Sequence, residues 1–169
     1  DRNLCNYIPM LYRNKPMFYR QEVSVDVAMI SVAPIDQHGF FNFSLTNSAT
    51  KAILETAKIV IVEVNNCLPY AAGGQEEGIH ISEVDYIVEA GDIPLAQLPS
   101  APADEIDTQV ARYIVEEITD GATIQLGIGG MPNAVGDLIA HSNVRDLGMH
   151  TEMLVDAYLT MHEKGKLTN

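Results

Sequence analysis

The chain has 169 residues, of which 47% are hydrophobic and 20% are charged, and its formal net charge at pH 7 is −13. This length corresponds to about one domain or slightly more, and the composition is that of a globular protein with enough apolar material for a core. The acidic balance excludes nucleic acid as an expected partner, because binding to phosphates requires a basic surface. An anionic small molecule would have to be held by local groups, since the overall field repels it.

No apolar run in the sequence approaches the ~20 residues that a membrane span needs, so no membrane partner is expected. The first residues lack the charged and apolar regions of a secretory signal. The two cysteines, Cys5 and Cys67, do not make a disulfide framework, and we expect them to be free thiols. These features together predict a cytoplasmic protein.

The first half of the chain has the pattern of a strand–helix–strand unit. Val23–Val32 alternates and then becomes continuously apolar, and Lys58–Val64 consists mainly of β-branched residues. Between them, Ser48–Ala57 has apolar residues at helical spacing. A strand, a helix and a strand in this order predict a mostly parallel sheet. Further short strands are expected over residues 40–45, 79–82 and 84–90.

Two loops in this half follow predicted strands. Ala33–Gly39 has proline and glycine in turn positions, and its histidine, His38, is expected to stabilise the turn. A ligand role for His38 is the weaker alternative, because no second His or Cys lies at ligand spacing. Asn65–Gly78 is rich in glycine, and its place after a sheet strand suits ligand contacts as well as it suits a flexible surface connection.

A domain boundary is predicted at Gly91–Asp104, which contains three prolines and follows neither helical nor strand periodicity. Beyond it, a helix is predicted over Glu105–Ile118 and a strand in the apolar run that begins at Thr123. A second strand over Leu147–Met153 and a helix over Asp156–Lys164 follow. This order of elements is only the first half of an α/β domain.

The stretch Thr123–Glu152 has the strongest indication of a site. After the apolar run come three glycines within four positions, Gly127, Gly129 and Gly130. An amphipathic pattern then begins at Pro132, which predicts a tight loop and a helix that starts at this proline. Free backbone N–H groups at a helix N-terminus favour negative charge. The second apolar run contains a single carboxylate, Glu152, and the two features together suggest a site.

Six sequence blocks resemble, in the same order, those of the acetyl-CoA hydrolase/transferase family. They are Val25–Ala28, Pro34–Gly39, Lys58–Asn65, His80–Glu89, Gln125–Val135 and His150–Met153. The resemblance covers nearly the whole chain and is closest to the 4-hydroxybutyrate and butyryl/acetate CoA-transferases. One loop, Pro69–Gly78, departs from the shorter version with a basic residue that the family leads us to expect, which argues against ligand contacts from this loop.

The resemblance implies an α/β fold with two CoA-transferase-like (NagB/RpiA-like) open-sheet domains. Residues 1–103 would be part of the N-terminal CoA-transferase domain, and residues 104–169 would be the start of the C-terminal one, which is only partly present. The partners implied are an acyl-CoA, a short-chain carboxylate, the remaining part of the full-length enzyme, and a second copy in a homodimer.

The resemblance also implies the chemistry. A CoA-transferase of this family moves coenzyme A between an acyl-CoA and a carboxylate such as acetate, butyrate or 4-hydroxybutyrate. The reaction is of the ping-pong type and passes through a glutamyl-CoA thioester, here on Glu152. The residues implied to contact coenzyme A are Gly127, Ile128, Gly129, Gly130 and Met131. Coenzyme A is then a substrate, and no tightly bound cofactor or metal is expected.

Several alternatives to the transferase remain. An acetyl-CoA hydrolase of the same family would differ in how well the closed site excludes water. A non-catalytic fragment or binding module is possible because the second domain is incomplete. A dinucleotide-binding oxidoreductase is disfavoured, since the third glycine is missing at the needed offset. A metal hydrolase is disfavoured because the five histidines show no paired ligand spacing. The sequence leaves open which carboxylic acid is exchanged and whether transfer or hydrolysis takes place.

Overall fold

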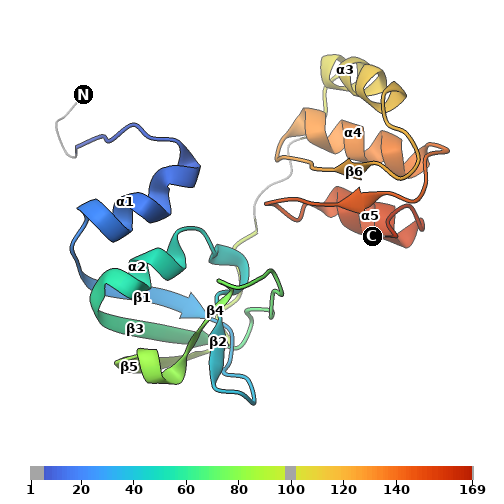
Figure 1. Cartoon of the computed structure of the whole chain (residues 1–169). Helices are drawn as coiled ribbons and strands as arrows, with labels where there is room; N and C mark the ends of the chain where they lie inside the picture. Colours follow the sequence, from blue (N-terminus) through green and yellow to red (C-terminus); the bar gives the residue numbers. More distant parts are fainter. Residues whose placement is uncertain (1–5, 98–101, 169) are drawn as a thin grey trace. The chain divides into compact units, whose positions relative to one another are not determined.

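A computed structural model describes residues 6–97 and 102–168, and the chain in it forms two units, Asp1–Ala96 and Gln97–Asn169 (Figure 1). Cys5, one of the two predicted free thiols, lies outside the described residues, whereas Cys67 is exposed and free. Part of the predicted domain boundary, residues 98–101, also lies outside them. Each unit has its own hydrophobic core and is described separately below.

Unit 1 contains a parallel three-stranded sheet, as the strand–helix–strand pattern predicts. Its strands are β1 (Val25–Val32), β3 (Ala57–Asn65) and β5 (Tyr86–Gly91), in the order β1-β3-β5. The short helix α2 (Thr50–Thr56) lies between β1 and β3 in the chain and covers one face of the sheet (Figure 1). The α/β fold with open sheets is therefore confirmed in this unit.

The core of unit 1 lies on the face of the sheet that α2 covers. Alternate residues of β1 and β3 point into it, among them Ala28, Val32, Val60 and Val62. An antiparallel ribbon of β2 (Phe40–Asn42) and β4 (Gly78–His80) adds Phe41 and Ile79 to the same cluster. Helix α1 (Lys15–Glu22), which follows the 3-10 helix η1 (Tyr12–Asn14), lies against α2.

Two predicted strands of unit 1 are shorter than expected. The strand predicted over residues 40–45 ends at Asn42, whose side-chain oxygen accepts a hydrogen bond from the Ser44 N–H at 2.8 Å, and the 3-10 helix η2 (Ser44–Thr46) follows. The strand predicted over residues 79–82 gives way to the 3-10 helix η3 (Ile81–Glu83). Here the His80 ring accepts a hydrogen bond from the Ser82 N–H, which turns the chain.

Unit 2 contains a short parallel pair of strands and three helices. The strands are β6 (Thr123–Ile124) and β7 (Gly148–Met149), and the helices are α3 (Glu105–Glu116), α4 (Gly130–His141) and α5 (Asp156–Glu163). Helix α4 contacts both α3 and α5 (Figure 1). The core between them consists of buried residues from all three helices and both strand ends: Ala111, Leu126, Ala134, Val135, Ile139, Ala140, Leu147, Tyr158 and Met161.

Helix α3 begins at a reciprocal capping arrangement. The Asp104 carboxylate accepts a hydrogen bond from the Asp107 N–H at 2.7 Å, and the Asp107 carboxylate accepts one from the Asp104 N–H at 3.2 Å. Such a pair satisfies two backbone donors that the first turn of a helix leaves open. Asp104 therefore marks the start of the helix that the sequence predicts from Glu105 onward.

Helix α4 begins at Gly130, two residues before the predicted start at Pro132. The prediction was wrong by this margin because the N–H groups of the first turn have no intrahelical partner, so a proline fits at any position of that turn. Farther along α4, Gly136 lies directly against α5, since a Cβ atom at Gly136 would collide with the Cβ atom of Ala157. This glycine allows α5 to pack closely against α4.

The strand predicted over Leu147–Met153 is regular only at Gly148–Met149, and Glu152 lies in a bend beyond it. The chain leaves the strand direction because the Thr151 hydroxyl donates a hydrogen bond to the Met153 carbonyl at 2.9 Å. A threonine hydroxyl that bonds to a nearby backbone group competes with the strand pattern in this way.

Candidate active site

The glycine loop and Glu152 leave two neighbouring parallel strands at the same edge of unit 2. Strands β6 and β7 pair in parallel, and the His150 N–H donates to the Ile124 carbonyl at 3.2 Å just beyond them. One residue farther, the Thr151 hydroxyl lies 3.5 Å from the Leu126 carbonyl oxygen. Gly127 directly follows Leu126, and Glu152 directly follows Thr151. The tertiary structure thus brings the two predicted halves of the site together.

The glycine loop exposes backbone donors at the start of the 12-residue helix α4. Among the described residues, the N–H groups of Gly127, Ile128 and Gly129 find no hydrogen-bond acceptor. Gly129 has φ 134° and ψ 174°, a conformation that residues with a Cβ atom rarely adopt. Open N–H groups combined with the positive end of the helix dipole suit a negatively charged ligand group.

The five predicted coenzyme A contacts differ in their surroundings. Gly127 is exposed, and a Cβ atom there would meet nothing within 4 Å, whereas the Ile128 side chain is 62% exposed. At Gly130, a Cβ atom would collide with the Asp107 carboxylate, and Met131 packs against the hydrophobic core. The start of the loop is therefore open to an anionic ligand. Its end is not, because the Asp107 carboxylate lies there and would repel a second negative charge.

Glu152 is exposed in the bend between β7 and α5. Two cavities of unit 2, each of about 390 Å³, are lined by other residues. The candidate site lies at an exposed edge of unit 2, where Gly127 and Glu152 are both accessible to solvent. An exposed carboxylate on a held turn can act as a nucleophile toward a bound thioester.

Sequence reasoning missed Tyr158, a buried tyrosine on α5 that is 1% exposed. Its hydroxyl accepts a hydrogen bond from the Leu126 N–H at 2.7 Å and lies 3.4 Å from the Ile124 carbonyl oxygen. The only hint in the sequence is that a tyrosine on the apolar stripe of a helix requires a partner for its hydroxyl. Which backbone group supplies that partner depends on how α5 packs.

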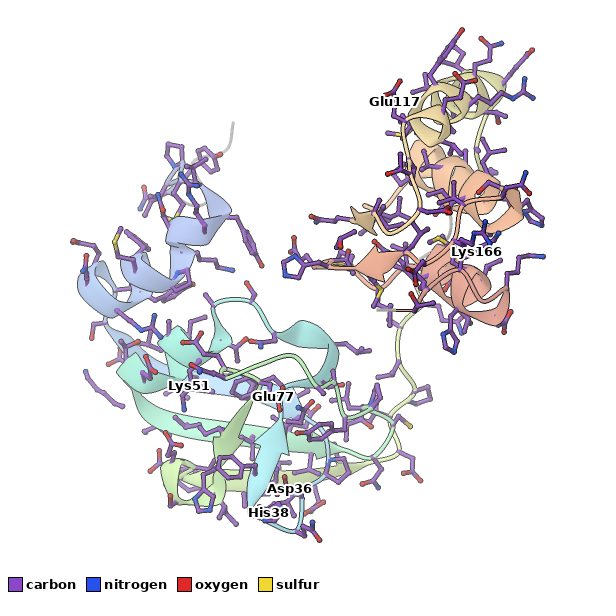
Figure 2. All side chains as sticks on the ribbon, turned by 45° about the vertical axis from the view of Figure 1, so that its right-hand side comes forward. Asp36, His38, Lys51, Glu77, Glu117 and Lys166 are labelled. Carbon is purple, nitrogen blue, oxygen red and sulfur yellow. The ribbon has the colours of Figure 1, made fainter. Side chains whose placement is uncertain are left out.

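A second group of titratable side chains lies in unit 1, where Asp36, His38, Tyr70 and Glu77 line a cavity of about 300 Å³. Three of them, Asp36, His38 and Glu77, are labelled in Figure 2. The Asp36 carboxylate accepts hydrogen bonds from the Phe40 N–H at 2.9 Å and from the His38 N–H at 2.8 Å, and these bonds hold its pKa below the ordinary value. The Asp36 side chain therefore stabilises this turn. The sequence had led us to expect that role for His38. The His38 ring lies 3.2 Å from the Gln37 amide nitrogen.

The loop Pro69–Gly78 is organised by its own glutamate. The Glu77 carboxylate accepts hydrogen bonds from the N–H groups of Gly73 and Gly74 and from the Tyr70 hydroxyl, and these bonds lower the pKa of Glu77. The same carboxylate raises the pKa of Tyr70. The glycine amides that could hold a ligand anion in this loop are bonded to the chain itself.

No group of three or more His, Cys, Asp or Glu side chains in residues 6–97 and 102–168 is arranged to hold a metal ion. Within the same ranges, every helix is too short or too polar to cross a bilayer.

The sequence profile of the acetyl-CoA hydrolase/transferase N-terminal domain matches residues 2–99 of this chain. A butyryl-CoA:acetate CoA-transferase from Anaerostipes caccae is 52% identical over 164 residues, which are 96% of this chain and 37% of the relative. The chain thus spans little more than a third of the length of this relative.

Solved structures of similar proteins cover nearly the whole chain. RipA from Yersinia pestis superimposes with a TM-score of 0.89 at 35% sequence identity, over 99% of this chain and 38% of RipA. A 4-hydroxybutyrate CoA-transferase from Porphyromonas gingivalis superimposes with a TM-score of 0.82 at 34% identity, over 95% of this chain and 40% of its own. Both the sequence and the fold therefore match CoA-transferases along the described residues.

Proposed function

The chain belongs to the acetyl-CoA hydrolase/transferase family, and from this membership we propose that the full-length protein is a CoA-transferase acting on an acyl-CoA and a short-chain carboxylate. The carboxylate is of the acetate, butyrate or 4-hydroxybutyrate type, because these acids occur in the names of similar proteins. The observation that carries the proposal is the common edge of β6 and β7, from which both the glycine loop and Glu152 leave.

We assign the two units to the two domains of such an enzyme. Unit 1 is part of the N-terminal CoA-transferase domain, and the profile match over residues 2–99 supports this assignment. Unit 2 is the start of the C-terminal domain, and both domains have the NagB/RpiA-like open-sheet fold. A homodimer in the cytoplasm stays a prediction.

Glu152 is the covalent carrier in the proposed reaction. Its carboxylate attacks the thioester carbonyl of the acyl-CoA, which forms a mixed anhydride and releases the CoA thiolate. The thiolate then attacks the glutamyl carbonyl, which forms the glutamyl-CoA thioester and releases the first carboxylic acid. A second carboxylate attacks this thioester, and the same two steps in reverse return the carboxylate of Glu152 and the new acyl-CoA.

The glycine loop supplies backbone donors for this reaction. Each attack on a carbonyl places negative charge on its oxygen, and preorganised N–H groups stabilise such charge. The open N–H groups of Gly127, Ile128 and Gly129 are the donors nearest in the chain to the edge that carries Glu152, and Gly130 and Met131 complete the predicted coenzyme A contacts.

The decisive experiment incubates the full-length protein with an acyl-CoA and searches for coenzyme A bound to the peptide that contains Glu152 by mass spectrometry. We expect the adduct in the wild type, and we expect Glu152→Gln to lower the rate of transfer by about three orders of magnitude or more, since it keeps the shape and removes the nucleophile. Glu163→Gln, at an exposed glutamate of α5, is the matched control and should be as active as the wild type. An adduct-free wild type, or an active Glu152→Gln variant, would refute the mechanism.

Hydrolysis of acetyl-CoA is the second candidate, because the family description includes hydrolases as well as transferases. The two activities share the glutamyl-CoA thioester and differ in the group that attacks it, a carboxylate or water. Release of free coenzyme A from acetyl-CoA, measured with and without an added carboxylate, separates them. A transferase releases coenzyme A slowly in either case and forms a new acyl-CoA only when the carboxylate is present.

A further inference from the structure

We propose that Tyr158 and Thr151 are positioning residues, whose hydroxyl groups hold the glycine loop in place relative to Glu152. The inference rests on the proposed function, because it concerns the covalent step on Glu152. It assigns to two hydroxyl groups, one on each side of Glu152 in the chain, a role in the reaction that neither composition nor spacing reveals.

Both backbone groups of Leu126 lie next to these hydroxyls. The Leu126 N–H donates to the Tyr158 hydroxyl at 2.7 Å, and the Thr151 hydroxyl lies 3.5 Å from the Leu126 carbonyl oxygen. Leu126 is itself buried at 6% exposure and directly precedes Gly127. The residue from which the glycine loop departs is therefore held at its N–H by Tyr158, and the Thr151 hydroxyl lies beside its carbonyl.

The Tyr158 hydroxyl takes over where the strand ladder stops. Strand β6 contains only Thr123 and Ile124, so the backbone of Leu126 lies beyond its last paired residue. A buried polar group requires a hydrogen-bond partner, and the Tyr158 hydroxyl is shared between the Leu126 N–H and the Ile124 carbonyl oxygen. The position of the loop is in this way determined by α5 as well as by the sheet.

The helix that carries Tyr158 follows directly on the bend with Glu152. Helix α5 begins at Asp156, and Tyr158 comes six residues after Glu152 in the chain. Close packing of α5 on α4 at Gly136 and Ala157 fixes where this helix lies. A short covalent path therefore connects Glu152 to Tyr158 through the start of α5. The Tyr158 hydroxyl in turn binds Leu126, the residue before the glycine loop.

The Thr151 hydroxyl links the bend that contains Glu152 to Leu126 at a second point. It donates to the Met153 carbonyl at 2.9 Å, which forms the bend that contains Glu152, and it lies within reach of Leu126. Loss of either hydroxyl lets the loop amides move relative to the carboxylate of Glu152. A shift of about 1 Å between reacting groups can lower the rate about a hundredfold without a comparable effect on ligand affinity.

The test measures the rate at which the CoA adduct forms on Glu152 in a single turnover of the full-length protein with saturating acyl-CoA. We expect Tyr158→Phe, which keeps the buried ring, to form the adduct about ten- to a hundredfold more slowly than the wild type. The KM for acyl-CoA should change much less than kcat, because the loop amides remain available for binding. Tyr113→Phe, at a tyrosine of α3 that is 73% exposed, is the matched control and should equal the wild type.

A pair of variants at Thr151 provides an independent arm that does not disturb the core. Thr151→Val removes the hydroxyl and should slow adduct formation, whereas Thr151→Ser keeps the hydroxyl and should restore it to near the wild-type rate. If Tyr158→Phe lowers the thermal midpoint so far that its rate has no meaning, this pair decides the question.

The outcomes separate the inference from the function on which it rests. A wild-type protein that forms no adduct refutes the transferase mechanism itself. A wild type that forms the adduct, together with Tyr158→Phe and Thr151→Val variants that form it equally fast, overturns the positioning role and leaves the mechanism intact. An equal loss in kcat and rise in KM would also overturn it, since that pattern indicates a general loss of the site.

Discussion

Gly127 and Gly129 belong to the same loop, but the backbone makes different demands on them. Gly129 has a φ of 134°, so any residue with a Cβ atom is strained there. Gly127 has no positive φ, and a Cβ atom added to it would meet nothing within 4 Å. A side chain at Gly127 is thus tolerated by the fold and would extend into the open space in front of the loop.

This difference predicts separable effects on function and on stability. Gly127→Ala should leave the thermal midpoint of the full-length protein unchanged and raise the KM for acyl-CoA about tenfold, because the added methyl group hinders close approach of the ligand. Gly129→Ala should instead lower the stability by about 1–3 kcal/mol. Thermal unfolding and steady-state kinetics of both variants check the two effects. An unchanged KM in Gly127→Ala would contradict the assignment of coenzyme A to this loop.

At the scale of elements, the loop between β3 and β4 shows how one carboxylate can order a glycine-rich segment. Two glycine N–H groups and the Tyr70 hydroxyl converge on the carboxylate of Glu77. The ionised form of Glu77 accepts these bonds, and its pKa is therefore lowered in the folded protein. Tyr70 and Glu77 fold the loop back on itself.

The lowered pKa predicts a dependence of stability on pH. A carboxyl whose pKa is lower in the folded than in the unfolded state stabilises the fold above its ordinary pKa, and this contribution is lost as the pH falls through the lowered value. We expect Glu77→Gln to be less stable than the wild type near neutral pH and to lose less stability on acidification to about pH 3. Thermal midpoints at both pH values provide the measurement.

Glu76→Gln is the matched control for this prediction. Glu76 is the neighbouring residue, and its carboxylate lies 3.4 Å from the Arg20 guanidinium, whereas the glycine N–H groups donate to Glu77. This variant should keep the difference between the two pH values that the wild type shows. If Glu76→Gln and Glu77→Gln respond alike, the hydrogen bonds of Glu77 do not order the loop.

At the scale of the whole molecule, one face of the β1-β3-β5 sheet carries several exposed apolar side chains within unit 1. Met29 is 76% exposed, Tyr86 is 60% exposed and Val88 is 50% exposed. Met29 and Tyr86 share this face, because Met29 pairs with Ile61 and Ile61 pairs with Tyr86. Val88 lies on it as well, since it follows Tyr86 by two positions in the same strand. Parallel sheets occur almost only with both faces covered. Since the chain spans 37% of the length of a similar CoA-transferase, we expect another part of the full-length protein to cover this face.

Met29→Lys tests this expectation in the full-length protein. A lysine on a covered apolar face should lower the free energy of unfolding by about 2 kcal/mol or more, because its charge loses contact with water. Gln37→Lys introduces the same charge at an exposed position of a polar turn and should change the stability by about 0.5 kcal/mol or less. Denaturant unfolding measures both. A Met29→Lys variant as stable as the control would indicate that this face is open to solvent in the full-length protein as well.

Much of the fold could be predicted from local sequence patterns. The β-branched run Lys58–Val64 lies within β3, and the apolar spacing of Glu105–Ile118 corresponds to α3. The ends of helices and strands could not be predicted where a side-chain hydrogen bond redirects the chain. The bond from the Thr151 hydroxyl to the Met153 carbonyl beyond β7 is an example. The order of the sequence blocks indicated the family because each block combines specific residue types at a specific spacing.

The sequence by itself determined the types of the elements, the family, and the two halves of the candidate site, since these depend on residue type and on spacing along the chain. The tertiary structure alone brought the glycine loop and Glu152 to the same edge and joined Tyr158 to Leu126, 32 positions away in the sequence. It also showed that Glu77 occupies the glycine amides of its own loop. Contacts of this kind depend on how closely helices and strands pack, as at Gly136 and Ala157, and no local pattern encodes that distance.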